Sequence, residues 1–367
     1  MIRTHHLKSS CRTLLVLLVI STTVNAEIPR TTEGKPDFSG VYDTGTLTPT
    51  QRPGWLGETE YLWPFVARSL NWVFALVSEW AIARDSDPDR EAPPVGGDGN
   101  NTAGAGGVGG YNAFWVDPGS SLGTIAGNVP TSILYDPPNG RYPPTLPSVG
   151  KRMGQRYQSF AHENSGTASW LAHDGPGPFD GPESLAPSER CLLSFASVVP
   201  VLPSLYNNYK RIVQTETHVM IMHEMVHDVR VIPFDAEHTL VPGGQWLGDS
   251  IAYWDGDTLV VEARNFTHVN SLPGSDENLH VVERFTLQED GNLLYDFTVN
   301  NDTVWTAPWS GRYIWKSEPE SKLYEYACHE GNYAMGNILR GARLLEKEWL
   351  EAEATTRDVP AGTSALD

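Results

Sequence analysis

Basic residues and cysteines are scarce in this chain of 367 residues. It has 26 Lys and Arg against 45 Asp and Glu, which gives a formal net charge of −19. Binding to nucleic acid requires clustered Lys and Arg against the phosphates, so we expect no nucleic-acid partner. Three cysteines are too few for a disulfide-stapled miniprotein, and 10% aromatic residues are too many for a disordered acidic chain. The chain is therefore expected to fold around a substantial core.

The sequence also lacks a run of apolar residues long enough to span a membrane. Leu14 to Ile20 is an unbroken apolar stretch, but a bilayer span needs about 20 residues. Val24-Asn25-Ala26 after it is a small-residue cleavage site. Three basic residues precede the stretch: Arg3, Lys8 and Arg12. Residues 1–26 are therefore predicted to be a secretory signal, and the mature protein is predicted to be periplasmic or secreted, without a stable membrane span.

Signal cleavage would remove Cys11 and leave Cys191 and Cys328. Two cysteines in an exported chain predict a disulfide between them. The alternative is a reactive Cys328 with His329 as its base. Neighbouring residues of a strand point to opposite faces, which argues against that pairing.

The rest of the mature chain predicts a mainly β protein with N-terminal additions. Apolar residues at helical spacing predict one helix over residues 61–83, and a Gly/Pro-rich loop follows at 91–110. These two features define an N-terminal segment, 27–110. A β domain is predicted over 111–345, and the end of a charged helix (340–354) with a flexible tail occupies 346–367.

Hairpins dominate the predicted β domain. Residues 209–234 are rich in β-branched and apolar residues. Residues 250–266 and 280–299 each consist of two alternating runs joined by an Asp-Gly turn, which is a strong hairpin signal. Successive hairpins make an antiparallel meander. We expect it to close into a lipocalin-like barrel, or to pack as a sandwich, because open sheet edges invite aggregation.

His223-Glu224-Met225-Val226-His227 matches the zinc-peptidase pattern H-E-x-x-H. That chemistry requires a helix, so that both histidines face one metal ion. The flanking residues are apolar and β-branched, which predicts a strand or a bend instead. A site with His223 and His227 as metal ligands is kept as a weak alternative, and no metal or cofactor is predicted.

Charged side chains within apolar strands are the more informative feature. They are unlikely to be buried without partners, so they lie on solvated faces or line a polar cavity. The candidate acid–base groups are Glu224 and Glu283. Arg284 or Arg230 would stabilise developing negative charge, and His280 or His227 would transfer protons. In a regular strand His280 and Arg284 share one face and Glu283 lies on the other. We expect His280 and Arg284 to face the barrel interior, with Glu283 inward as the alternative.

The C-terminal half resembles a large family of exported bacterial proteins, mostly of unknown function. The resemblance spans about 110–345. Its longest blocks are Trp246-Leu247-Gly248-Asp249-Ser250 with Trp254-Asp255-Gly256-Asp257-Thr258-Leu259-Val260-Val261-Glu262, then Glu277-Asn278-Leu279-His280-Val281-Val282-Glu283-Arg284-Phe285, and Tyr324-Glu325-Tyr326-Ala327-Cys328-His329-Glu330-Gly331-Asn332-Tyr333. It also covers Tyr111-Asn112-x-Phe114-Trp115, Asp136-Pro137-Pro138-Asn139-Gly140-Arg141, Asn265-Phe266 and Trp305-Thr306-x-Pro308-Trp309. The resemblance implies that the protein is exported and shares the fold of this family, but it does not point to a particular reaction. Members usually carry Tyr or another residue where His223 stands, which weakens the zinc-peptidase interpretation.

Three functions remain open on the sequence. The preferred one is an exported enzyme that applies acid–base chemistry (as a lyase, isomerase, cyclase or hydrolase) to an apolar or ring-bearing small molecule in a barrel cavity. The second is a carrier that binds such a ligand without transforming it, and the third is the zinc peptidase. A carrier needs a nearly apolar cavity, whereas an enzyme needs two titratable groups within reach of one ligand atom.

Overall fold

The computed structural model describes residues 28–73, 117–150 and 166–357. The predicted signal at 1–26, the loop at 91–110 and the end of the tail lie outside these residues. Of the helix predicted over 61–83, residues 64–73 are helical and the remainder is outside the described part.

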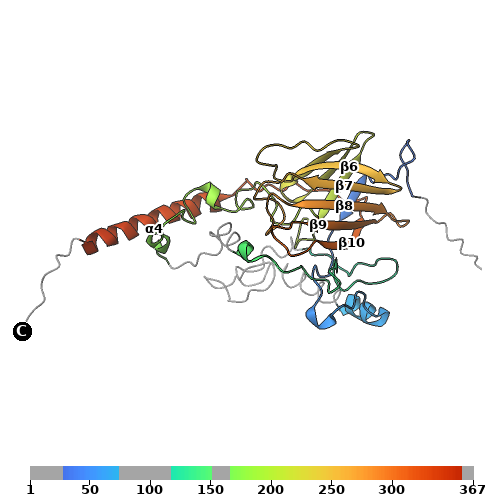
Figure 1. Cartoon of the computed structure of the whole chain (residues 1–367), viewed down its shortest axis with the longest axis horizontal. Helices are drawn as coiled ribbons and strands as arrows, with labels where there is room; N and C mark the ends of the chain where they lie inside the picture. Colours follow the sequence, from blue (N-terminus) through green and yellow to red (C-terminus); the bar gives the residue numbers. More distant parts are fainter. Residues whose placement is uncertain (1–27, 74–116, 151–165, 358–367) are drawn as a thin grey trace, which may run out of the picture.

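One antiparallel sheet forms the body of the protein. Among the described residues, nine strands are hydrogen-bonded side by side in the order β5-β4-β3-β1-β10-β9-β8-β7-β6. A tenth strand, β2, pairs with β10 outside this order. Figure 1 shows β6 to β10 as one curved wall. The strands are β1 (Gly40–Asp43), β2 (Leu134–Asp136), β3 (Tyr209–Gln214), β4 (His218–His223), β5 (Val229–Pro233), β6 (Asp249–Asp255), β7 (Thr258–Arg264), β8 (His280–Leu287), β9 (Leu293–Asn300) and β10 (Trp309–Ser317).

The sheet closes almost completely on itself. A parallel bridge between Phe234 and Ala252 brings the end of β5 beside β6. The backbone N–H of Asp235 donates to the carbonyl of Ala252 at 2.9 Å at the same place. The predictions of a mainly β protein and of a meander that closes into a barrel are therefore confirmed.

Alternation along the strands decides which side chains enter the barrel. In β8, Val281, Glu283, Phe285 and Leu287 are buried and the residues between them are partly exposed. The largest buried side chains of the core are mainly aromatic, and neighbouring rings pack edge-on or tilted. The largest of them are Trp309, Trp315, Tyr295, Tyr313, Phe285 and Phe297.

The barrel has two unlike ends. One end carries the short connections from β3 to β4, from β6 to β7 and from β8 to β9, and we call it the turn end. The other end, where β4 finishes and β8 begins, carries the long connections that precede β3, β8 and β10. We call this the loop end, because its loops provide most of the candidate site.

The N-terminal segment contributes to the barrel. β1 lies between β3 and β10, so one strand of the wall comes from before the predicted boundary at residue 111. Four residues are too few to show a readable alternation, and this is why the sequence did not reveal β1.

The C-terminal helix α4 (Tyr333–Arg357) is longer than the predicted 340–354. It extends away from the barrel in Figure 1 and packs against residues 168–179. The indole of Trp170 donates to Glu346 at 3.1 Å, and the Arg343 guanidinium donates to the carbonyl of Phe179 at 2.7 Å.

Candidate functional site at the loop end

A buried ion pair crosses the barrel interior. Arg230 Nη2 on β5 lies 2.6 Å from Glu283 Oε2 on β8, and the two side chains are 2% and 0% exposed. Arg230 also donates to Ser250 Oγ at 3.0 Å, and Tyr295 OH donates to Glu283 Oε1 at 2.6 Å. The structure thus brings two of the predicted site residues together inside the barrel.

His280 and Arg284 lie on the outside of β8. Their side chains are 37% and 42% exposed, and they pair with Glu262 and Asp255 respectively. The preference for these two residues as the inward pair was wrong, and the alternative with Glu283 inward holds. The regular alternation of β8, which has buried Val281 and Phe285 on either side of Glu283, sets this choice.

The predicted motif at 223–227 forms a tight turn between β4 and β5. A short 3-10 turn, η5 (Met225–His227), replaces any regular helix, and Val226 and His227 have positive φ. The prediction of a strand or bend is confirmed. His223 is buried at the end of β4 and His227 is exposed, so the two rings do not share a face as the zinc-peptidase motif requires. Within the described residues, no three His, Cys, Asp or Glu side chains are grouped to hold a metal ion.

Glu224 and His227 hold a short segment that we call the C-terminal strap, Tyr324–Cys328. Glu224 Oε1 accepts from the backbone N–H of Tyr324 at 2.9 Å, and His227 Nε2 accepts from that of Tyr326 at 3.0 Å. The strap ends at a disulfide between Cys328 and Cys191, which confirms the predicted pairing. These contacts give Glu224 and His227 a positioning role in the fold.

Lys210 and His223 face the barrel interior from neighbouring strands. They are directly opposite each other in the pairing of β3 with β4. Burial lowers the pKa of Lys210 to about 8, although the carboxylates of Glu224 and Asp43 partly offset this. Burial also lowers the pKa of His223 well below its usual value, and the positive charges of Lys210 and Arg230 lower it further.

A segment that we call the plug, Val198–Leu202, closes the barrel interior at the loop end. Val198, Val199 and Val201 are almost fully buried in the core. The backbone of Val201 is held on both sides, because its N–H donates to Tyr295 OH at 2.9 Å and its carbonyl accepts from Tyr313 OH at 3.1 Å. Tyr295 therefore links the plug directly to Glu283.

The other side of the plug borders a cavity of about 940 Å³. Hydroxyl groups of Thr46, Thr48, Ser197 and Ser204 contribute to its wall. No Asp, Glu, Lys, Arg or His occurs among the described residues that line it. Its apolar lining includes Tyr142, Val149, Phe195, Leu202, Leu272 and Trp305.

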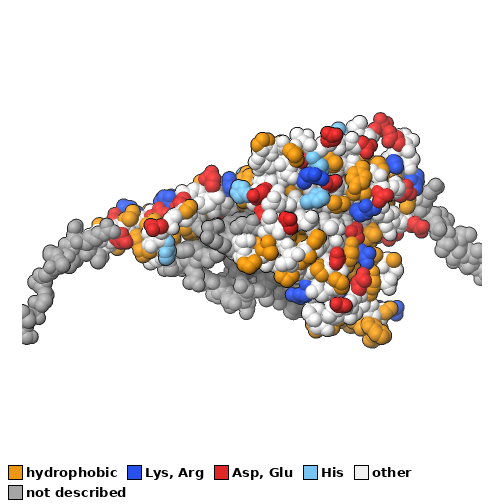
Figure 2. All heavy atoms as spheres, in the orientation of Figure 1, with side chains coloured by type: hydrophobic (Ala, Val, Ile, Leu, Met, Phe, Trp, Pro, Cys, Tyr) orange, Lys and Arg blue, Asp and Glu red, His pale blue; other side chains and the backbone are white. Residues whose placement is uncertain are grey.

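A second polar cluster lies on the outer face of β6 to β8. His238 Nδ1 is 2.8 Å from Asp249 Oδ2, and His280 Nε2 is 2.9 Å from Glu262 Oε1. Arg264 also pairs with Glu262. Figure 2 shows histidine and basic side chains gathered over this face. Asp249, Glu262 and His280 lie on β6, β7 and β8 respectively, and the strand pairing brings them together.

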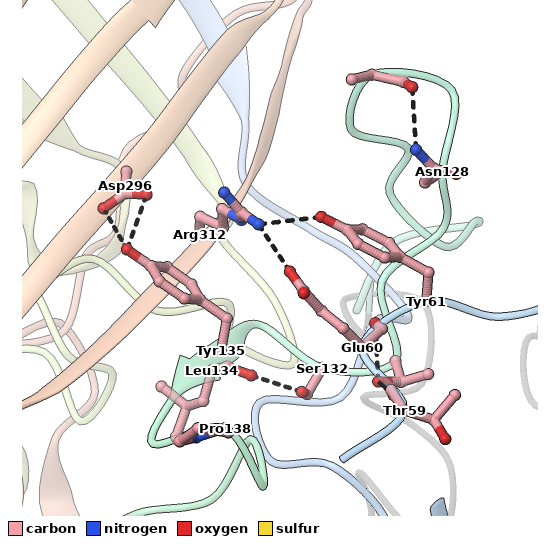
Figure 3. A network of polar contacts seen from close by, with 12 residues as sticks. Thr59, Glu60, Tyr61, Asn128, Ser132, Leu134, Tyr135, Pro138, Asp296 and Arg312 are labelled. Atoms are coloured by element: carbon pink, nitrogen blue, oxygen red, sulfur yellow. Dashed lines mark hydrogen bonds and ion pairs between the residues drawn. The ribbon is translucent and has the colours of Figure 1, made fainter.

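A third polar network connects the N-terminal segment to β9 and β10 (Figure 3). Tyr135 OH lies 3.2 Å from both carboxylate oxygens of Asp296, and Arg312 stacks over the Tyr135 ring. Arg312 also pairs with Glu60 at 2.7 Å and donates to Tyr61 OH at 3.0 Å. Burial and, to a smaller extent, the nearby Asp296 carboxylate together raise the pKa of Tyr135 to about 12. The network fastens residues 60–61 and 135 onto the outside of the barrel.

Lys210, Tyr295 and His238 are among the residues that the sequence analysis missed. In a regular strand Lys210 lies on the same face as Ile212, and Tyr295 lies on the same face as Leu293 and Phe297. The alternation of apolar residues could therefore have placed both side chains inside the barrel. His238 lies in a loop, where no periodic signal exists.

Comparison with protein-family models and with curated proteins finds no match for this chain. Among the described residues, no helix is long and apolar enough to cross a membrane. The disulfide is of the kind that persists in an oxidising compartment.

Proposed function

We propose that this protein is an exported carrier that binds a small, uncharged, ring-bearing molecule in the cavity at the loop end. The observation that carries the proposal is the lining of that cavity, in which apolar and aromatic side chains are joined by a few hydroxyl groups and by no charged side chain of the described residues. Its volume of about 940 Å³ is at the upper end of the range for small-molecule sites. A charged ligand would lose its hydration there without gaining a counter-ion.

The interior of the barrel supports a structural role for its charges. Arg230 and Glu283 neutralise each other and are almost fully buried. The plug lies between this ion pair and the cavity. The three valines of the plug belong to the core, whereas Leu202 at its end and Ser197, which precedes it, line the cavity. A ligand in the cavity therefore meets hydroxyl groups and aromatic rings, not the ion pair.

The neutral fluorescent probe N-phenyl-1-naphthylamine tests the carrier function. We expect the mature protein to bind it with an increase in probe fluorescence, and Ala196→Trp to weaken binding at least about tenfold because the indole would occupy the cavity. Ala172→Trp, at an exposed position of the short turn η3 (Ser169–Ala172), is the matched control and should bind like the unmodified protein. Failure of the mature protein to bind the probe, or equal binding by Ala196→Trp, would overturn the proposal.

An acid–base enzyme is the second candidate function. Lys210, His223 and Glu224 favour it, because a buried lysine whose pKa is lowered to about 8 is suited to proton transfer near neutral pH. These residues lie at the same end of the barrel as the cavity, and residues 204–205 lead from the cavity wall towards β3. If a bound ligand is transformed, Lys210→Met should abolish turnover and leave binding intact. Equal turnover by this variant would exclude the lysine as the acid–base group.

A further inference from the structure

A second cavity opens beside the first and has the opposite electrostatic character. Its volume is about 760 Å³, and Gly274 lines both cavities, so the loop from Leu272 to Glu277 forms a shared wall. Unlike the first cavity, this one carries several charged side chains. Its polar and aromatic lining includes Glu183, Arg190, Trp246, His268, Asp276 and Glu277.

The lining has three carboxylates against one guanidinium. Asp276 is buried and its carboxylate oxygens accept from Asn278, Asn301 and Thr303, so it is committed to the protein. Glu183 and Glu277 are exposed, and neither forms an ion pair within the described part of the chain. The cavity therefore offers two carboxylates to a ligand.

Trp246 adds an aromatic surface to the same cavity. It is 41% exposed, so part of its indole is accessible to a ligand in the cavity. An indole face attracts cations through its quadrupole, and carboxylates nearby add a charge of the complementary sign. The net charge of −19 further raises the concentration of cations near the surface.

We propose that this second cavity is a binding site for an alkylammonium group, which would contact Trp246 and pair with Glu183 and Glu277. The site is independent of the carrier function, because the first cavity has no charged residue among its described lining. It gives the protein two neighbouring sites of different chemistry, one for an uncharged ring-bearing molecule and one for an organic cation.

Choline and 3,3-dimethylbutan-1-ol provide a direct test, because they have nearly the same shape and differ in charge. Titration of the mature protein should show choline binding in about the millimolar range, with the neutral alcohol at least about tenfold weaker. Added NaCl should weaken choline binding, because the contacts are partly exposed to solvent.

Trp246→Leu should weaken choline binding at least about threefold, and so should the double variant Glu183→Gln/Glu277→Gln. Trp63→Leu, which removes another exposed indole that does not line the cavity, is the matched control and should leave binding unchanged. Circular dichroism should show that all variants remain folded. N-phenyl-1-naphthylamine should bind Trp246→Leu normally, and choline should bind Ala196→Trp normally, so the two sites can fail separately.

Three results would overturn the proposal. One is the absence of choline binding up to about 50 mM, which is far above the expected range. Another is equal binding of choline and its neutral isostere. The third is unchanged choline affinity in both Trp246→Leu and Glu183→Gln/Glu277→Gln, which would show that choline binds elsewhere.

Discussion

Arg230 and Glu283 are 2.6 Å apart inside the barrel, although β5 and β8 are not neighbours in the sheet. The pair therefore connects two walls across the interior. Tyr295 extends this connection from Glu283 to the plug. The closure of the loop end thus depends on a chain of three polar side chains within an aromatic core.

Removing one partner of this pair should destabilise the protein strongly. Arg230→Met or Glu283→Gln leaves the other group buried and uncompensated, which costs about 3–5 kcal/mol, whereas Arg230→Met/Glu283→Leu should recover much of that loss. Urea unfolding measures these differences. Arg284→Met is the control, because it removes an exposed ion pair on the same strand and should cost at most about 1 kcal/mol. Equal effects of Arg230→Met and Arg284→Met would contradict the structural role.

Tyr295→Phe should loosen the plug. The variant removes the acceptor for the Val201 N–H and the donor to Glu283, which should cost about 1–3 kcal/mol. Hydrogen exchange at the Val201 amide should become faster. Tyr253→Phe, at an exposed position of β6, should change neither stability nor exchange at Val201. An unchanged Val201 exchange rate in Tyr295→Phe would show that the tyrosine does not hold the plug.

The lowered pKa of Lys210 predicts that the free energy of unfolding rises between pH 8 and pH 10. Its pKa falls from 10.5 in the unfolded chain to about 8 in the folded protein, mainly through burial. In this range the unfolded state binds more protons, so the free energy of unfolding increases with pH, with a full contribution of about 3 kcal/mol by pH 10.5. Below pH 8 the penalty for burying the charge is fully present.

Denaturant titrations at several pH values test this contribution. Lys210→Met should lose the rise, and Lys322→Met, at an exposed lysine, should keep it. Measurements should stop near pH 10, because buried tyrosines such as Tyr295 have a raised pKa and ionise first in the unfolded chain. A rise of the same size in Lys210→Met would assign it to other groups.

The disulfide should stabilise the protein by about 2–5 kcal/mol, because it joins residues 137 positions apart and restricts the unfolded chain. Cys191→Ser/Cys328→Ser should lower the melting temperature and speed exchange at the amides of Tyr324 and Tyr326 in the C-terminal strap. Thiol titration of the denatured, unreduced mature protein should detect no free thiol. Two free thiols, or an unchanged melting temperature in the double variant, would contradict this role.

Local patterns in the sequence were sufficient for the two Asp-Gly hairpins and for the disulfide. The Asp-Gly turns of the 250–266 and 280–299 segments set the hairpins, because a two-sided alternation and a tight turn are both encoded within a few residues. Because the side chains of a strand alternate between its two faces, the inward residues of β8 could be one of two sets. One set contains Glu283, and the other contains His280 and Arg284. Local pattern could not choose between them, because both sets contain apolar residues.

Only the tertiary structure decided which set is inside and what each charge contacts. Glu283 is buried because Arg230, which is 53 residues earlier and on a non-adjacent strand, compensates its charge. His280 can remain outside because Glu262 arrives beside it through the pairing of β7 with β8. The two cavities are likewise formed by loops that are distant in sequence and meet only when the barrel closes. Spacing along the chain determines the face of a strand, whereas burial of a charge depends on a partner that only the closed fold provides.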